Sequence, residues 1–189
     1  MKRYARMPNS EIRNGSMSLT AVQPEHIESI RQWRNEQMDV LRQAHPISPD
    51  EQATYFERMI WPDMDSSTPR QILVAIHLNG EFIGYGGIVH LSWTDLRGEV
   101  SFLIRTELMC DPATVDRLFS DYLTLIKRLA FRDLGLRRLS TETFAHRTDI
   151  IPLLERNGFV REGRMREHVL VNGVPTDSLI HGCLAHDEP

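Results

Sequence analysis

The feature that most constrains the fold of this chain is a β-hairpin signal between residues 71 and 89. Two apolar runs rich in strand-forming residues, 71–78 and 81–89, flank the dipeptide Asn79-Gly80. Asn-Gly between two such runs favours a two-residue hairpin turn, because both turn residues must adopt a positive φ. The sequence therefore predicts an antiparallel pair of strands around which the other elements pack.

Three glycines, Gly84, Gly86 and Gly87, lie within the second of these strands. They open no helix, as the glycines of a phosphate-binding loop would, so they predict a strand that is bulged or closely approached by a neighbour. Other runs with strand character complete the predicted sheet. They are 11–22 with a turn at Asn14-Gly15, 97–105, 137–143, and 159–171 with 176–184 joined through Asn172-Gly173.

Helices are predicted between these strands from capping residues and apolar spacing. Ser48 and Glu51 form a capping box, so a helix should begin here, and it should end at Trp61-Pro62. The remaining helices are marked in the same way. They are one that contains Ile27, Ile30 and Trp33, the longest from Asp111-Pro112 to Gly135, and a short one over 148–156.

No repeat, low-complexity tract or linker divides the sequence. With 189 residues, 41% of them hydrophobic, the chain can bury one proper core. We expect an N-terminal leader over residues 1–16, loose at its start, and a single domain over residues 17–189. The predicted class is α+β, with a mixed, mostly antiparallel sheet.

The charge balance excludes several kinds of partner. A formal net charge of −4 without a basic tail argues against nucleic acid. No apolar run approaches the roughly 20 residues needed to span a membrane, and none follows the basic N-terminus as a secretory signal would require. Cys110 and Cys183 form no disulfide framework, and the eight histidines show no metal-ligand spacing. We therefore expect a reduced, cytoplasmic protein without a metal.

The order of the predicted elements resembles that of the GCN5-related N-acetyltransferase (GNAT) superfamily. That order is strand, two helices, hairpin, strand, long helix, strand, helix and paired strands, and the resemblance covers roughly residues 17–184. It implies a GNAT fold, in which two central strands splay apart and helices flank the sheet. It also implies transfer of acetyl from acetyl-CoA to a primary amine.

Two groups of short motifs refine the resemblance. Trp33-Arg34-Asn35, followed by Ile47-Ser48, resembles the substrate side of acetyltransferases acting on nucleotide-linked amino sugars, and more loosely that of ribosomal-protein N-acetyltransferases. The closing strands of both groups resemble residues 157–168 and 177–180. The favoured acceptor is therefore a small-molecule amine such as a nucleotide-linked amino sugar. The alternatives are a protein N-terminus, or a degenerate GNAT that binds a ligand or partner without catalysis; a homodimer is possible.

The sequence departs from the family in the loop expected to hold the pyrophosphate of coenzyme A. GNAT enzymes usually place glycines before the long helix, whose N-terminus supplies N–H donors. Residues 106–114 contain no glycine, and Glu107 and Asp111 add negative charge. Arg105 and Arg117 could offset that charge, while Asp111 is equally well explained as a plain helix cap.

The remaining cofactor contacts are implied by the resemblance. The pantetheine arm should pair like an extra strand in the gap between strands 99–105 and 138–143. Backbone N–H groups of Phe102, Leu103 and Ile104 are then the expected oxyanion donors. Arg147 stands where many relatives have an asparagine, and it could reach a phosphate of the cofactor or lie in a solvated turn.

Two carboxylates are candidates for the general base. Glu142 matches a strand carboxylate that takes the amine's proton in several GNAT enzymes. The alternative is a solvated glutamate on an edge strand. Glu99 is the competing base, and its alternatives are a salt bridge to Arg97 and a place on a solvated face.

Many GNAT enzymes have a tyrosine as the general acid where this sequence has Leu154. The departing thiolate of coenzyme A must therefore gain its proton from another group. Water, Tyr122, Tyr85 and His146 are the candidates. Cys110 has no histidine partner along the sequence and fits a small apolar residue before a helix better than a nucleophile.

The acceptor wall is expected along the first helix and the loop after it, with a contribution from a closing strand. Arg34 and Asn35 could contact an acceptor or fix the end of their helix, and an arginine fork suits a diphosphate. His168 could face the acceptor or lie on the strand surface. The predicted acceptor residues are Arg34, Asn35, Arg42, His45 and His168.

Overall fold

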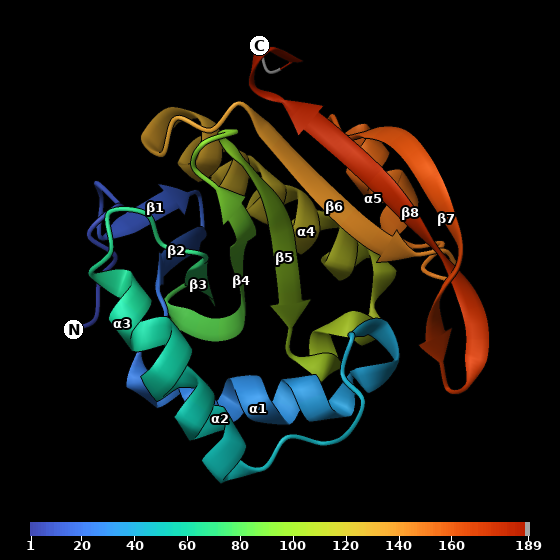
Figure 1. The fold of residues 1–189 in the computed structure, drawn as a ribbon, viewed down its shortest axis with the longest axis horizontal. Coiled ribbons are helices and arrows are strands. Elements are labelled where there is room, and N and C mark those ends of the chain that lie inside the picture. The colour runs from blue at the N-terminus through green and yellow to red at the C-terminus, as the bar shows by residue number, and fades with distance from the viewer. Residues whose placement is uncertain (188–189) are drawn as a thin grey trace.

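An eight-stranded sheet forms the centre of the computed structural model, which describes residues 1–187 (Figure 1). The strands lie in the order β1-β2-β3-β4-β5-β6-β8-β7, and only the β5–β6 pair is parallel. This confirms the predicted α+β class. The strands are β1 (Glu11–Asn14), β2 (Met17–Ala21), β3 (Ile72–Leu78), β4 (Glu81–Ser92), β5 (Arg97–Ile104), β6 (Arg138–Phe144), β7 (Val160–Val171) and β8 (Val174–Leu184).

The predicted hairpin is formed by β3 and β4. Asn79 and Gly80 have φ values of 52° and 85°, as a turn with two left-handed residues requires. The predicted close approach is also present, because a Cβ on Gly86 would lie 2.5 Å from the hydroxyl of Tyr122. A larger residue at Gly86 would therefore displace the long helix that carries Tyr122.

Five α-helices connect the strands, and α4 and α5 lie behind the sheet in the view of Figure 1. Asp111 caps α4 as predicted, and Gly135, at a φ of 72°, follows the π-helical turn Arg128–Asp133 that extends it. The bounds are α1 (Ile27–Glu36), α2 (Pro49–Tyr55), α3 (Trp61–Met64), α4 (Pro112–Lys127) and α5 (Ile150–Arg156).

Two expectations about local structure are wrong. The second helix does not end at Trp61-Pro62, because a π-helical turn over Phe56–Ile60 leads directly into α3. Pro62 lies in the first turn of α3, where a missing N–H costs little. The start of the chain is not loose either. Tyr4 is fully buried, and its hydroxyl accepts a hydrogen bond from the N–H of Leu73 at 3.0 Å.

The predicted splay lies between β5 and β6. These strands pair at only three positions, Arg97 with Arg138, Gly98 with Leu139 and Glu99 with Ser140. Beyond them β5 stays with β4 and β6 stays with β8, so the two strands diverge. A parallel pair that opens in this way leaves backbone groups unpaired inside the sheet.

Candidate active site

A cavity of about 230 Å³, here called the strand cleft, lies where β5 and β6 diverge. Its walls come from the two strands, from the loop after α1, and from α4 and α5. Both candidate bases belong to it, as does Leu154 at the usual tyrosine position. The lining includes Arg42, Glu99, Phe102, Thr141, Glu142, Thr143, Arg147 and Leu154.

Strand β5 presents unpaired backbone groups to this cleft. The N–H of Arg105 donates to the carbonyl of Ile83 at 2.9 Å. Because facing residues of an antiparallel ladder alternate between bonded and non-bonded pairs, Leu103 bonds to β4 while Phe102 and Ile104 turn their amides toward β6. Of the three expected backbone donors, Phe102 and Ile104 therefore face the gap and Leu103 does not.

Glu142 lies in the middle of the sheet, not on an edge strand, since β6 is flanked by β5 and β8. Its side chain is 10% exposed, and one carboxylate oxygen forms an ion pair with Arg42. The other oxygen, Oε1, lies 3.7 Å from Nε2 of His168 and has no hydrogen-bond partner among the described residues. Three predicted site residues from three separate segments thus meet at one place.

The cleft also holds a second buried polar atom without a partner, the Oγ1 of Thr141. Buried polar atoms are nearly always hydrogen-bonded, so two such atoms in one cleft indicate room for a polar ligand. Together with the free amides of β5, they fit an extended molecule that carries amide groups. The residues of the cleft therefore suit a pantetheine arm.

The N-terminus of α4 does not fit a pyrophosphate in the same way. Asp111 accepts hydrogen bonds from the N–H groups of Ala113 (3.3 Å) and Thr114 (3.1 Å). The hydrogen bond from the Thr114 hydroxyl lowers the pKa of Asp111 further, so this carboxylate is an anion held on the helix donors. Arg105 forms an ion pair with Glu81.

The remaining arginines differ in position. Arg117 is exposed on α4 and lies outside the lining of the strand cleft. Arg147 lies in the wall of the cleft, with its Nε 3.6 Å from the carboxylate of Asp149. Arg147 is therefore better placed than Arg105 or Arg117 to meet a phosphate beside the cleft.

A larger cavity of about 920 Å³, here called the helix cavity, lies between α1, α2 and strands β3 to β5. Arg34 donates from Nη1 to the hydroxyl of Tyr85 at 2.7 Å and from Nε to Gln43 at 3.2 Å. Burial raises the pKa of Tyr85, and Arg34 opposes this rise only in part, so Tyr85 stays neutral. Both hydrogen-bond partners of the Arg34 guanidinium are thus uncharged.

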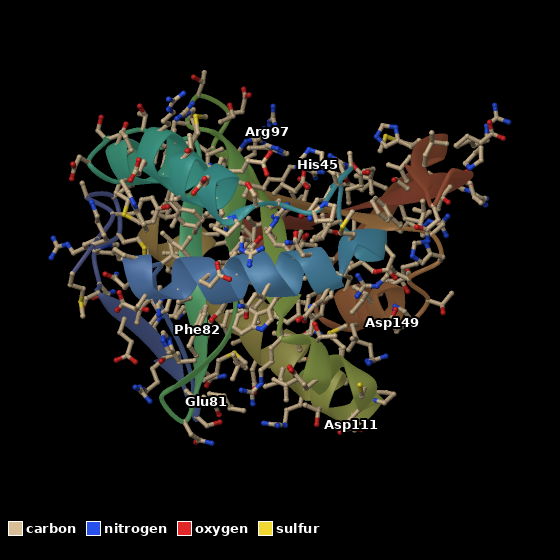
Figure 2. The ribbon with its side chains drawn as sticks, turned by 90° about the horizontal axis from the view of Figure 1, so that it is seen from below. His45, Glu81, Phe82, Arg97, Asp111 and Asp149 are labelled. Atoms are coloured by element: carbon tan, nitrogen blue, oxygen red, sulfur yellow. The ribbon has the colours of Figure 1, made fainter. Side chains whose placement is uncertain are left out.

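Figure 2 shows where two residues of the helix cavity lie relative to the N-terminus of α4. His45 and Arg97, which line the helix cavity, lie on the α2 side of α1 in this view. Asp111 lies on the opposite side, at the start of α4. The capped N-terminus of α4 therefore lies across α1 from these two residues of the helix cavity.

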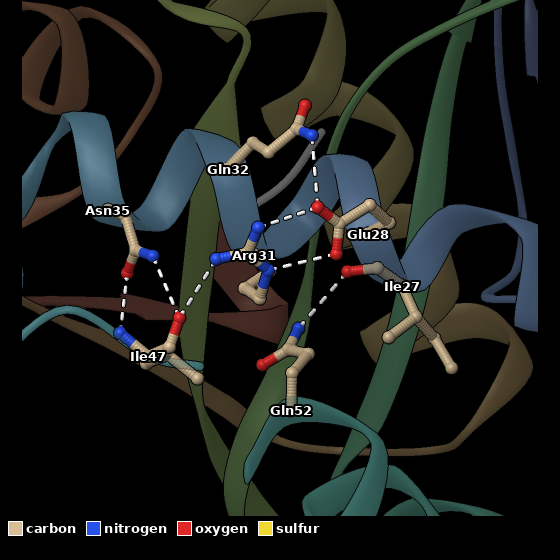
Figure 3. Close-up of polar contacts among 7 residues, drawn as sticks. All are labelled: Ile27, Glu28, Arg31, Gln32, Asn35, Ile47 and Gln52. Carbon is tan, nitrogen blue, oxygen red and sulfur yellow. Dashed lines mark hydrogen bonds and ion pairs between the residues drawn. The ribbon is translucent and has the colours of Figure 1, made fainter. Parts of the chain in front are cut away.

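Asn35 has a positioning role. Its Nδ2 donates to the carbonyl of Ile47 at 2.9 Å, and its Oδ1 accepts from the N–H of Ile47 at 2.8 Å (Figure 3). Arg31 adds a second bond to the same carbonyl at 3.0 Å. Asn35 lines neither cavity; it fixes the loop that carries Arg42 and His45.

The two cavities meet at β4 and β5, where Val89 and Ser101 line both. Glu99, in the strand cleft, lies 3.2 Å from Nδ1 of His90, which lines the helix cavity. Glu99 does not pair with Arg97, whose partner is Asp95 at 3.6 Å. Sequence reasoning missed His90 and Ser101, because their importance depends on where two cavities join.

The candidates for the proton donor differ in accessibility. The hydroxyl of Tyr122 accepts from the N–H of Gly87 at 2.7 Å and donates to the carbonyl of Ser101 at 2.5 Å. It is inserted into the β4–β5 ladder, and burial raises its pKa. His146 is exposed in the turn after β6.

Residues 1–187 contain no group of metal-binding side chains and no helix suited to a membrane. In that range no three or more histidine, cysteine, aspartate or glutamate side chains are grouped so that they could hold a metal ion. None of the helices in that range is long and apolar enough to cross a membrane.

The structure is similar to solved structures of acetyltransferases. Spermidine N-acetyltransferase from Vibrio cholerae, in complex with CoA and spermine, matches with a TM-score of 0.78 and 18% identity over 92% of this chain and 98% of that chain. A probable acetyltransferase of the GNAT family from Chromobacterium violaceum matches with a TM-score of 0.75 and 17% identity, covering 99% of this chain and 92% of that chain. Identities this low show the shared fold alone. No curated protein sequence matches the chain.

The family is shown by the sequence itself. The family model of the acetyltransferase (GNAT) domain matches residues 19–180. This range contains both cavities' strands and every candidate catalytic residue. The chain therefore belongs to the GNAT acetyltransferase family, whose enzymes transfer acetyl from acetyl-CoA, here to an amine.

Proposed function

We propose that this enzyme acetylates the primary amine of an anionic small molecule, with a nucleotide-linked amino sugar as the favoured class. The observation that carries the proposal is the guanidinium of Arg34 in the wall of the helix cavity. Its partners, Tyr85 and Gln43, are neutral, so its positive charge is free to bind an anion.

The other charged groups of the helix cavity also favour an anionic acceptor. Among the described residues, Glu51 is the only carboxylate in its lining, and Glu51 accepts hydrogen bonds from the N–H and hydroxyl of Ser48 at 2.8 Å in the capping box. Four more basic groups line this cavity, and three of them lie within 4.0 Å of a carboxylate, so Arg34 is the main positive charge that would repel a polycation. The four groups are His45, Arg70, His90 and Arg97.

The charge of this wall separates the enzyme from some of its structural neighbours. The V. cholerae protein is a spermidine N-acetyltransferase, and its structure contains spermine. A polyamine carries several positive charges and would be repelled by an arginine-rich wall. A basic peptide would be disfavoured for the same reason, so the alternative of a protein N-terminus is weaker.

In the proposed complex, the strand cleft holds the pantetheine arm of acetyl-CoA and supplies the thioester for the reaction. Phe102 and Ile104 would donate their N–H groups, and Arg147 would contact a phosphate. The amine would approach from the helix cavity, past Arg34 and His45. Arg42 and His168 would lie beside Glu142, with Arg42 in the wall of the strand cleft.

An acceptor panel tests the proposal. Purified enzyme is given acetyl-CoA with a nucleotide-linked amino sugar, with spermidine, or with a basic peptide that has a free N-terminus, and release of the CoA thiol is measured. The amino-sugar nucleotide should have the highest kcat/KM. Preference for spermidine or the peptide would contradict an anionic acceptor.

The variant Arg34→Gln sharpens this test. Loss of a charge-assisted hydrogen bond should raise the KM for the anionic acceptor about 10-fold, with little change for a cationic one. Arg58→Gln is the matched control, because Arg58 is exposed and lies outside the lining of the helix cavity. Equal effects of the two variants would remove Arg34 from the acceptor site.

A further inference from the structure

The place where the two cavities meet has its own pair of titratable side chains. Val89 on β4 faces Glu99 on β5 in the ladder, and Val89 lines both cavities. His90 follows Val89 and lines the helix cavity, while Glu99 lines the strand cleft. The pair therefore spans the junction between the spaces for the amine and for the thioester.

The backbone holds His90 in an unusual conformation. The β4–β5 register shifts between Val89 and Ser92, and His90 lies in this bulge with a φ of 50°. A histidine with positive φ is uncommon, and bulges beside active sites often redirect a side chain. Here the bulge brings Nδ1 of His90 to 3.2 Å from Oε2 of Glu99.

This contact fixes the chemistry of the imidazole ring. A carboxylate only accepts hydrogen bonds, so Nδ1 carries the hydrogen and donates it to Glu99. Nε2 is then the unprotonated nitrogen of the neutral ring, and a base must have such a nitrogen available. The exposed position of His90 also lets its ring exchange protons with water.

We propose that His90 is the general base of acetyl transfer and that Glu99 is the residue that positions it. This inference rests on the proposed function only in that an amine is acetylated. Glu142 is less suited to the step, because one of its oxygens is paired with Arg42 and it does not line the helix cavity. Glu142 instead holds Arg42 at the edge of the strand cleft.

In this proposal His90 moves a proton from the amine to water as acetyl is transferred. An amine that arrives as an ammonium group gives one proton to Nε2 of His90, which becomes an imidazolium stabilised by Glu99. The amine nitrogen forms the new C–N bond while the C–S bond of the thioester breaks. The nitrogen loses a second proton, which ends on the departing thiolate, and His90 returns its own proton to water.

Two substitutions of His90 test its role while respecting the backbone. Asparagine and glycine both tolerate a positive φ, so His90→Asn and His90→Gly should fold. Each should lower kcat by about 100-fold or more at neutral pH, with the KM for acetyl-CoA nearly unchanged. His186→Asn is the matched control, since His186 is also an exposed histidine near a carboxylate, Asp187 at 3.8 Å, and lies outside both cavities.

Added imidazole gives a readout that a structural role would not move. It should restore part of the activity of His90→Gly but not of Glu142→Gln. Glu99→Gln should lower kcat less than His90→Asn and should shift the pH dependence of kcat. Full kcat with an unchanged pH profile in His90→Asn, or a large loss confined to Glu142→Gln, would overturn the proposal.

A measurement without any acceptor separates this inference from the proposed function. Nitrogen NMR of His90 should show the tautomer with hydrogen on Nδ1 in the wild type and a mixture in Glu99→Gln. Hydrogen on Nε2 in the wild type would overturn the dyad. A wild type that prefers a cationic acceptor would contradict the proposed function and leave the result for His90 intact.

Discussion

The two ends of the proposed acetyl-CoA site differ in how they depend on sequence. The strand cleft arises because β5 and β6 pair at three positions and then follow different neighbours. It is a product of strand topology and backbone hydrogen bonding. The N-terminus of α4 depends on side chains, and here Asp111 occupies the N–H donors of Ala113 and Thr114. Strand topology therefore forms one end of the proposed site, and side chains determine the other.

Filling the strand cleft should have the largest effect. Thr143 is buried in its wall, and Thr143→Trp would place an indole in a cavity of about 230 Å³. We expect acetyl-CoA binding to weaken by about 100-fold or more, because the cofactor arm and the new ring cannot share this volume. Calorimetric titration with acetyl-CoA measures the effect.

The control for this variant is Thr176→Trp, at a position on β8 outside both cavities. Circular dichroism should show that both variants keep the fold. If Thr143→Trp folds and still binds acetyl-CoA as tightly as the wild type, the cofactor arm does not enter between β5 and β6. The proposal that the divergence of β5 and β6 forms the cofactor site would then be wrong.

The arginine beside the cleft should have the next largest effect. Arg147→Gln removes the cation best placed for a phosphate, and we expect acetyl-CoA to bind about 10-fold more weakly. Dephospho-CoA and CoA, titrated in parallel, show which phosphate is contacted. Arg128→Gln, an exposed arginine outside the cleft, should leave binding unchanged; an equal loss in both variants would indicate a general charge effect.

Local patterns predicted the elements of this fold well. The turn at Asn79-Gly80, the cap at Asp111 and the helix end at Gly135 each depend on a few neighbouring residues, so the sequence shows them directly. Two misses involved longer-range packing. Burial of Tyr4 against β3 and the continuation of a helix through Pro62 depend on elements that the local sequence does not show.

The candidate site was predictable in its parts but not in its pairings. Family resemblance pointed to Glu142, Arg42 and His168 separately, yet their meeting depends on a loop, β6 and a bulge in β7. His90 carried no signal, because its position follows from a bulge in β4. Residues that act through a partner distant in sequence require the fold to be known.

The smallest expected effect comes from a substitution at the N-terminus of α4, which should make this helix end a better site for the pyrophosphate. Asp111→Ser keeps a good helix cap, since serine and aspartate cap helices about equally well. It removes one negative charge from the α4 N-terminus, so a pyrophosphate would meet less repulsion there. We expect acetyl-CoA to bind about threefold more tightly at low salt, with the gain disappearing as salt screens the charge.

Asp50→Ser is the matched control for this last change, because Asp50 lies in the first turn of α2 instead. It should leave acetyl-CoA binding unchanged at every salt concentration. A salt-dependent gain in Asp111→Ser but not in Asp50→Ser would place the pyrophosphate near the N-terminus of α4. No gain in either variant would mean that the phosphates bind away from the N-terminus of α4. A loss of acetyl-CoA affinity of about 10-fold in Arg147→Gln would then place them beside Arg147.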